Sequence, residues 1–148
     1  MTDESLLDGR GSDADTADLP PVPPLHVQVP ARVAVLAGVR RQLRAWAEAA
    51  GLFGVDVESV VLAGYEALAN AAEHAFQPGE SGTITLTAEL ADGQLLVRVT
   101  DTGKWREPPA DPGTRGRGLL LIRGLARTSS VRPGPEGTTV EMTWRFPA

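Results

Sequence analysis

Three polar residues at helical spacing are the first feature of the sequence that suggests chemistry. Glu66, Asn70 and Glu73 lie four and then three residues apart, so within a helix they share one face. The amide oxygen of an asparagine is a hard neutral ligand that suits Mg²⁺. A glutamate one turn earlier can orient or deprotonate a hydroxyl group that attacks a phosphate. The alternative is a solvated helix face, but the alanines around Asn70 leave little bulk there, and asparagine is a poor helix former.

The segment Asp101-Thr102-Gly103 directly follows a stretch that alternates as a β-strand does. A buried aspartate at the end of a strand could accept a hydrogen bond from an adenine amino group, and the glycine would let the base approach the backbone. Asp followed by Gly after a strand is also ordinary turn chemistry. Both interpretations stay open on this motif alone.

Two glycine-containing motifs come later in the chain. Arg115-Gly116-Arg117-Gly118 runs into a predicted helix, where exposed backbone N–H groups and arginine side chains would favour phosphate. A flexible loop is the alternative. Gly137-Thr138-Thr139 lies at a hairpin into the final predicted strand, and ordinary turn chemistry would be the preferred interpretation if the other three motifs were absent.

The surrounding pattern predicts the elements that hold these motifs. Helical spacing of apolar residues indicates helices over 31–50, 57–75 and 118–127, and alternation indicates strands at 26–29, 83–87, 95–100, 130–132 and 138–146. Pro30 suits the first turn of a helix, Gly51 a helix end and Asp56 an N-cap. Asp92-Gly93 is the strongest hairpin signal. Because strands and helices do not alternate regularly, we expect an α+β two-layer sandwich. Its mixed or antiparallel sheet is covered on one face by about three helices.

The acidity of the chain is confined to its beginning. Residues 1–24 carry six acidic residues and one arginine, which accounts for the whole net charge of −5. This segment is rich in Asp, Gly and Ser and ends in a proline run, so we expect a disordered tail. A regulatory arm is the alternative. The folded domain is predicted over residues 25–148.

Composition excludes several classes of site. The chain of 148 residues has no cysteine and only two histidines, His26 and His74, so disulfides and histidine-built metal sites are not expected. The balanced charge of residues 25–148 does not predict nucleic-acid binding. The apolar runs are too short to cross a bilayer, and the N-terminus lacks the apolar core of a signal peptide. We therefore expect a soluble cytoplasmic protein.

The order of the motifs carries more information than any one of them. Glu66-Ala-Leu-Ala-Asn70, Asp101-Thr-Gly103, Arg115-Gly-Arg-Gly118-Leu119 and Gly137-Thr138 occur in sequence. This series resembles the ATP-binding signature of the GHKL superfamily, in the variant found in bacterial anti-sigma-factor serine/threonine kinases. The resemblance covers about residues 25–147. It implies the Bergerat, or histidine-kinase-like ATPase, fold.

The resemblance also implies roles for individual residues. Asn70 would coordinate a Mg²⁺ ion bridging the ATP phosphates, and Glu66 would be the catalytic base. Asp101 would bind the adenine amino group, with Gly103 shaping the pocket and Thr138 assisting through its hydroxyl group. Residues 104–117 would form the ATP lid. Gly116, Gly118 and Leu119 would cradle the phosphates with backbone amides, and either Arg115 or Arg117 would reach the terminal phosphate.

Two functions are compatible with this family. The first is a serine/threonine protein kinase that phosphorylates a small anti-sigma-factor antagonist and also binds a sigma factor. Retention of both Glu66 and Asn70 favours it, because phosphoryl transfer needs a metal and a positioned nucleophile. The second is a nucleotide-dependent partner-switching module with little turnover. The family also implies a homodimer.

Overall fold

A computed structural model describes residues 22–74, 81–103, 120–135 and 137–146. The elements in chain order are β1 (Leu25–Pro30), the 3-10 turn η1 (Val33–Val35), α3 (Leu36–Ala49), α4 (Val55–His74), β2 (Thr83–Ala91), β3 (Gln94–Asp101), β4 (Thr128–Gly134) and β5 (Gly137–Arg145). Residues 120–125 are also helical.

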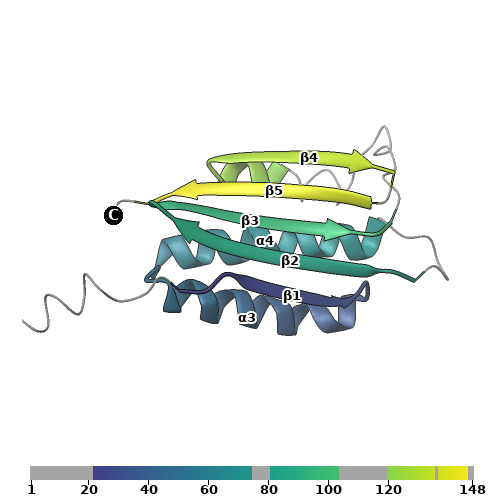
Figure 1. Cartoon of the computed structure of the whole chain (residues 1–148), viewed down its shortest axis with the longest axis horizontal. Helices are drawn as coiled ribbons and strands as arrows, with labels where there is room; N and C mark the ends of the chain where they lie inside the picture. Colours follow the sequence, from purple (N-terminus) through teal and green to yellow (C-terminus); the bar gives the residue numbers. More distant parts are fainter. Residues whose placement is uncertain (1–21, 75–80, 104–119, 136, 147–148) are drawn as a thin grey trace, which may run out of the picture.

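The strands form one sheet in the order β1-β2-β3-β5-β4, and every neighbouring pair is antiparallel. Figure 1 shows α3 and α4 side by side behind the sheet, with the short helix of residues 120–125 behind β4 and β5. The predicted α+β two-layer sandwich is therefore confirmed. The sheet is antiparallel throughout the described strands.

The core lies between the sheet and the helices because alternate strand residues point inward. In β2 the buried positions are Ile84, Leu86 and Ala88, and β3, its neighbour, continues the pattern. From the helices the core receives, among others, Leu36, Val39, Leu43, Val60, Ala67 and Leu68. Burying this apolar surface is the main driving force for packing the two layers together.

Two predicted turns form as the sequence indicates. Asp92 and Gly93 both have positive φ, 55° and 77°, which is the geometry of the tight hairpin turn that matches strand twist. Gly51 follows α3 with φ 100°, its N–H donates to the Glu48 carbonyl, and the Leu52 N–H donates to Ala47. These two bonds are the hydrogen bonds of a Schellman helix end.

Three predicted element ends were wrong. Pro30 does not begin a helix: it ends β1, pairing with Thr83, because an edge strand tolerates a residue without an N–H. Asp56 is not an N-cap, since α4 already begins at Val55 and Asp56 lies in its first turn. The third helix ends at residue 125 and not 127, because the Arg127 N–H donates to the Thr143 carbonyl on β5.

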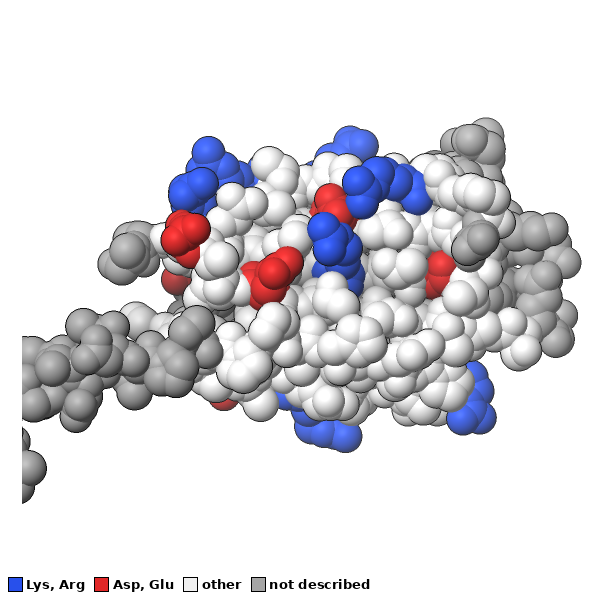
Figure 2. Space-filling view, viewed as in Figure 1, with Lys and Arg blue, Asp and Glu red and all other residues white. Residues whose placement is uncertain are grey.

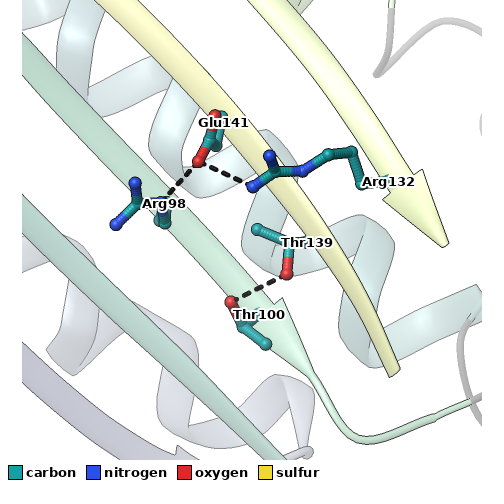
Figure 3. A network of polar contacts seen from close by, with 5 residues as sticks. All are labelled: Arg98, Thr100, Arg132, Thr139 and Glu141. Carbon is teal, nitrogen blue, oxygen red and sulfur yellow. Dashed lines mark hydrogen bonds and ion pairs between the residues drawn. The ribbon is translucent and has the colours of Figure 1, made fainter. Parts of the chain in front are cut away.

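The outer face of the sheet, away from the helices, is polar and only lightly charged. Figure 2 shows its charged side chains gathered toward β3, β5 and β4, while the part over β1 and β2 is mostly uncharged. In Figure 3 Glu141 accepts from both Arg98 and Arg132, and Thr100 contacts Thr139. The hydrogen bond from Arg98, together with the nearby arginine charges, lowers the pKa of the Glu141 carboxyl.

None of the described helices combines the length and the apolar character needed to span a bilayer.

Candidate functional site

Three chain segments that carry predicted site residues meet at one end of the sandwich. The C-terminal end of α4, the end of β3 and the start of β5 all lie at the right of Figure 1. The antiparallel order produces this meeting, because β3 runs toward the end at which β5 begins. The end of β3 with Asp101, the start of β5 with Thr138 and the C-terminal end of α4 are therefore drawn from distant parts of the sequence to one side of the molecule.

Asp101 is the last residue of β3, and its side chain points to the helix layer. It is only 5% exposed. Its Oδ1 accepts a hydrogen bond of 2.9 Å from the backbone N–H of Gly103, two residues further along the chain. Gly103 is itself buried. The prediction that Asp101 is buried, and more than a surface turn residue, agrees with this geometry.

Thr138 lies directly opposite Asp101 in the β3–β5 ladder. It is 4% exposed, and these two are the buried polar side chains among the residues that the structure describes. Burial raises the pKa of the Asp101 carboxyl, and hydrogen bonds from the backbone N–H groups of Gly103 and Thr138 oppose that rise. The pair forms a buried acceptor site in an otherwise apolar layer.

The Thr138 hydroxyl group is an unsatisfied part of this site. Its Oγ1 is buried and has no hydrogen-bond partner within the described residues. A buried polar group left without a partner costs about 1–3 kcal/mol. A ligand that offers a hydrogen-bond donor or acceptor here would remove that cost. The pair Asp101–Thr138 therefore suits a ligand with a heterocyclic ring whose edge carries hydrogen-bonding groups.

Sequence reasoning included Gly137 in the motif series, with an ordinary turn as the alternative, but did not identify its structural role. A Cβ at this position would lie 1.8 Å from the Asp101 carbonyl oxygen, and φ is 150°. Only glycine permits the start of β5 to approach β3 this closely. The glycine before Thr138 was the available signal, but the close approach is a property of the paired strands.

Glu66 and Asn70 lie one turn apart on α4, and both are half-buried. The Asn70 Nδ2 is buried without a hydrogen-bond partner in the described part of the chain. A solvated helix face would not bury this amide, so that alternative does not fit Asn70. Glu73, one turn further on, is exposed.

The residues available to a metal ion are few. Within the described ranges no three His, Asp or Glu side chains gather closely enough to form a metal site. Mg²⁺ commonly binds through one or two protein oxygens and completes its shell with phosphate oxygens and water. The side-chain oxygen of Asn70 is a ligand of that type, whereas its unsatisfied Nδ2 is a hydrogen-bond donor and would not coordinate the ion.

Hydrogen bonds fix the chain on both sides of residues 104–119. On one side Thr102 and Thr83 bond reciprocally, Thr102 N–H to Thr83 carbonyl at 3.2 Å and Thr83 N–H to Thr102 Oγ1 at 3.1 Å. On the other side the Leu125 carbonyl accepts from Ser59 Oγ at 3.1 Å and from Trp144 Nε1 at 3.0 Å. The chain before residue 104 is thus joined to β2, and the chain after residue 119 is joined to α4 and β5.

The remaining predicted phosphate-binding residues lie outside the described residues. They are Arg115, Gly116, Arg117, Gly118 and Leu119. Their role stays a prediction.

The sequence of this chain is similar to those of a known domain family and of two named kinases. A family model described as the histidine kinase-like ATPase domain matches residues 29–144. The serine-protein kinase RsbW of Listeria monocytogenes serovar 1/2a is 34% identical over 134 residues, covering 80% of this chain and 85% of that protein. The serine-protein kinase RsbW of Listeria innocua serovar 6a is 34% identical over 79 residues, 53% of this chain and 50% of that protein.

Solved structures show the same fold. The crystal structure of the RsbU and RsbW domains of Rv1364c from Mycobacterium tuberculosis matches with a TM-score of 0.71 and 33% identity. The match covers 86% of this chain and 34% of that chain, so this chain spans about a third of it. The histidine kinase domain of the Erythrobacter litoralis EL346 blue-light activated kinase matches with a TM-score of 0.54 and 22% identity, over 76% of this chain and 60% of that chain. That second likeness concerns the fold alone.

Proposed function

The chain belongs to the histidine kinase-like ATPase domain family, and we propose that it is an anti-sigma-factor-type serine/threonine protein kinase. Its protein substrate is a small anti-sigma-factor antagonist. The observation that carries the proposal is the buried pair Asp101–Thr138, with an unsatisfied hydroxyl group, at the end of the fold where α4, the helix that carries Glu66 and Asn70, also ends.

Asp101 and Thr138 supply the adenine site. The Asp101 carboxylate accepts a hydrogen bond from the adenine amino group, which gives this buried acceptor a donor from outside the protein. The Thr138 hydroxyl group, which lacks a protein partner, bonds to the same edge of the base or to water beside it. Gly103 leaves room for the base next to the backbone. Recognition by a buried polar pair strongly disfavours a ligand without the matching groups.

Asn70 holds the cation that accompanies ATP. When bound, Mg²⁺ neutralises charge on the β- and γ-phosphates during transfer. Asn70 is half-buried on α4. Residues 104–117 form the ATP lid, in which Arg115, Gly116 and Arg117 bind phosphate together with Gly118 and Leu119 beyond it.

Glu66 is the catalytic base. The serine or threonine hydroxyl oxygen of the acceptor protein forms a bond to the γ-phosphorus, and the bond from that phosphorus to the bridging oxygen of ADP breaks. The hydroxyl proton passes to the Glu66 carboxylate. Position is the main requirement of this step, since phosphoryl transfer depends largely on alignment and charge neutralisation.

The protein also binds a sigma factor and forms a homodimer. The outer sheet face is the proposed dimer surface, because helices leave it uncovered and Figure 2 shows it mostly uncharged toward β1 and β2. Sedimentation velocity tests this. A Thr85→Arg variant, altered on that face, should sediment as a monomer, and Thr85→Ser should remain dimeric. A wild type that is monomeric at every concentration contradicts the homodimer.

Calorimetry of nucleotide binding tests the function. ATP and ADP are titrated with and without Mg²⁺ into the wild type and Asp101→Asn. Binding that depends on Mg²⁺ and is lost in the variant supports the nucleotide site. Phosphorylation of an anti-sigma-factor antagonist then distinguishes a kinase from a partner-switching module with little turnover. No binding of the wild type at millimolar ATP contradicts the proposal.

A further inference from the structure

A cationic groove lies on the helix layer, between α3 and α4. It encloses a cavity of about 280 Å³. Its lining consists of arginines from α3 and a carboxylate, two aliphatic residues and an aromatic residue from α4: Arg40, Arg41, Arg44, Glu58, Val61, Leu62 and Tyr65. We call this surface the arginine groove.

The arginine groove combines unpaired positive charge with an apolar floor. Arg44 is engaged by Glu58 through two hydrogen bonds of 2.7 and 3.1 Å. Arg40 and Arg41 have no carboxylate partner among the described residues. Beneath them Leu62 is 42% exposed, and the Arg40 guanidinium group lies 5.0 Å from the centre of the Tyr65 ring. An acidic peptide with some apolar residues matches such a surface.

We propose that the acidic N-terminal segment, residues 1–21 of this same chain, docks in the arginine groove. The segment contains six acidic residues and one arginine, and it holds the entire net charge of −5. It also contains the pair Leu6-Leu7 between Glu4 and Asp8, apolar residues flanked by acids. The charges and the apolar content of the two surfaces are thus complementary.

The place at which the segment leaves the domain makes this contact reachable. The Pro23 carbonyl accepts a hydrogen bond of 2.8 Å from Trp46 Nε1 on α3. Arg41 lies five residues before Trp46 on that helix, about 8 Å along its axis at 1.5 Å per residue. The four residues from Asp18 to Val22 span up to about 14 Å when extended. The length of the segment therefore allows Asp18, the acidic residue nearest the domain, to approach these arginines.

Tethering compensates for the weakness of each contact. A single exposed ion pair contributes little, and salt screens it. A segment attached near its binding surface has a high effective concentration there, so several weak contacts suffice to keep it bound. We expect a docked state that is sensitive to salt.

Docking does not depend on the proposed function, so it can be tested even if the chain fails to bind ATP.

Paramagnetic relaxation enhancement tests the docking. The natural chain has no cysteine, so Ser12→Cys gives a single attachment point for a nitroxide label on the full chain. We expect loss of amide signal intensity for Arg41, Leu62 and Tyr65. The loss should disappear in about 1 M NaCl, where the Debye length is about 3 Å. It should also disappear in the double variant Arg40→Gln, Arg41→Gln.

The matched control is Arg127→Gln, an exposed arginine outside the groove, which should keep the full intensity loss. Equal loss in the groove variant and in this control would overturn the proposal, and so would the absence of any loss on α3 and α4. Docking between two chains is detected in a mixture of two samples. One chain carries the nitroxide label without ¹⁵N, and the other carries ¹⁵N without the nitroxide label. Intensity loss in that mixture equal to the loss within one chain would mean docking on a second copy, which also overturns it.

Discussion

Asp101 and Thr138 face each other across the β3–β5 ladder, and the Thr138 backbone N–H bonds to the Asp101 carboxylate. Both side chains are buried. The carboxylate thus receives two backbone donors, from Gly103 and from Thr138, while the Thr138 hydroxyl group remains unsatisfied. A buried hydroxyl group without a partner costs free energy that a methyl group in its place would not, which supports the proposed ligand site.

The first prediction concerns the pH dependence of stability. Burial raises the pKa of Asp101 above its unfolded value, so the folded state binds the proton more tightly. Its contribution to the free energy of unfolding is therefore full below the unfolded pKa and is lost as pH rises through the folded pKa. Urea unfolding of wild type and Asp101→Asn should show the wild type losing stability relative to the variant from about pH 4 upward.

Glu141 supplies the control for that measurement. The hydrogen bond from Arg98 lowers its pKa, so its contribution is present above the unfolded pKa and is lost as pH falls. The difference between wild type and Glu141→Gln should change with pH in the opposite direction. If the difference in unfolding free energy between wild type and Asp101→Asn did not change with pH, burial would not raise the pKa of the Asp101 carboxyl.

The second prediction concerns the approach of β5 to β3. Gly137→Ala should reduce the free energy of unfolding by at least about 2 kcal/mol, because its Cβ would lie 1.8 Å from the Asp101 carbonyl oxygen at positive φ. The matched control is Gly124→Ala, where nothing lies within 4 Å of the added Cβ. In that helix the change should be neutral or stabilising by about 0.5–1 kcal/mol. Equal effects in denaturant unfolding would contradict the close approach.

The third prediction separates binding from transfer at α4. Asn70→Ala should lose Mg²⁺-dependent ATP binding, because the remaining protein groups offer the cation little. Glu66→Ala should bind ATP normally and lose phosphate transfer by about 10²–10⁴-fold, the usual contribution of a general base. Calorimetry and a single-turnover phosphorylation assay measure the two effects. Normal transfer by Glu66→Ala would mean that the base lies elsewhere.

The fourth prediction concerns the contact between α3 and α4. A Cβ on Gly64 would lie 2.6 Å from Leu43 Cδ2, and Leu43 is fully buried, so Gly64→Ala should cost about 1–3 kcal/mol. Gly38→Ala, whose Cβ would lie 3.7 Å from Arg41 Nη2, should stabilise by about 0.5–1 kcal/mol. Thermal unfolding of both variants measures the difference. A harmless Gly64→Ala would show that the two helices can move apart.

Local signals in the sequence predicted those features that depend on a few neighbouring residues. Asp92-Gly93 specifies a hairpin because both positions require positive φ, and the alternation in β2 and β3 identifies their buried faces. The spacing of Glu66 and Asn70 on one helix face, and of Asp101 and Gly103 after a strand, is likewise local. The resemblance then identified the family, and the comparisons confirm it.

The sequence by itself determined the α+β class, the hairpin and the residue types of the candidate site. Only the tertiary structure decided that Gly137 must meet the Asp101 backbone, that Pro30 ends an edge strand and that the arginines of α3 face Tyr65 of α4. The physical reason is the distance along the chain between the residues that interact. Turns and helix faces follow from backbone conformation over a few residues, whereas close approach, burial and charge pairing depend on segments that folding brings together from far apart in the chain.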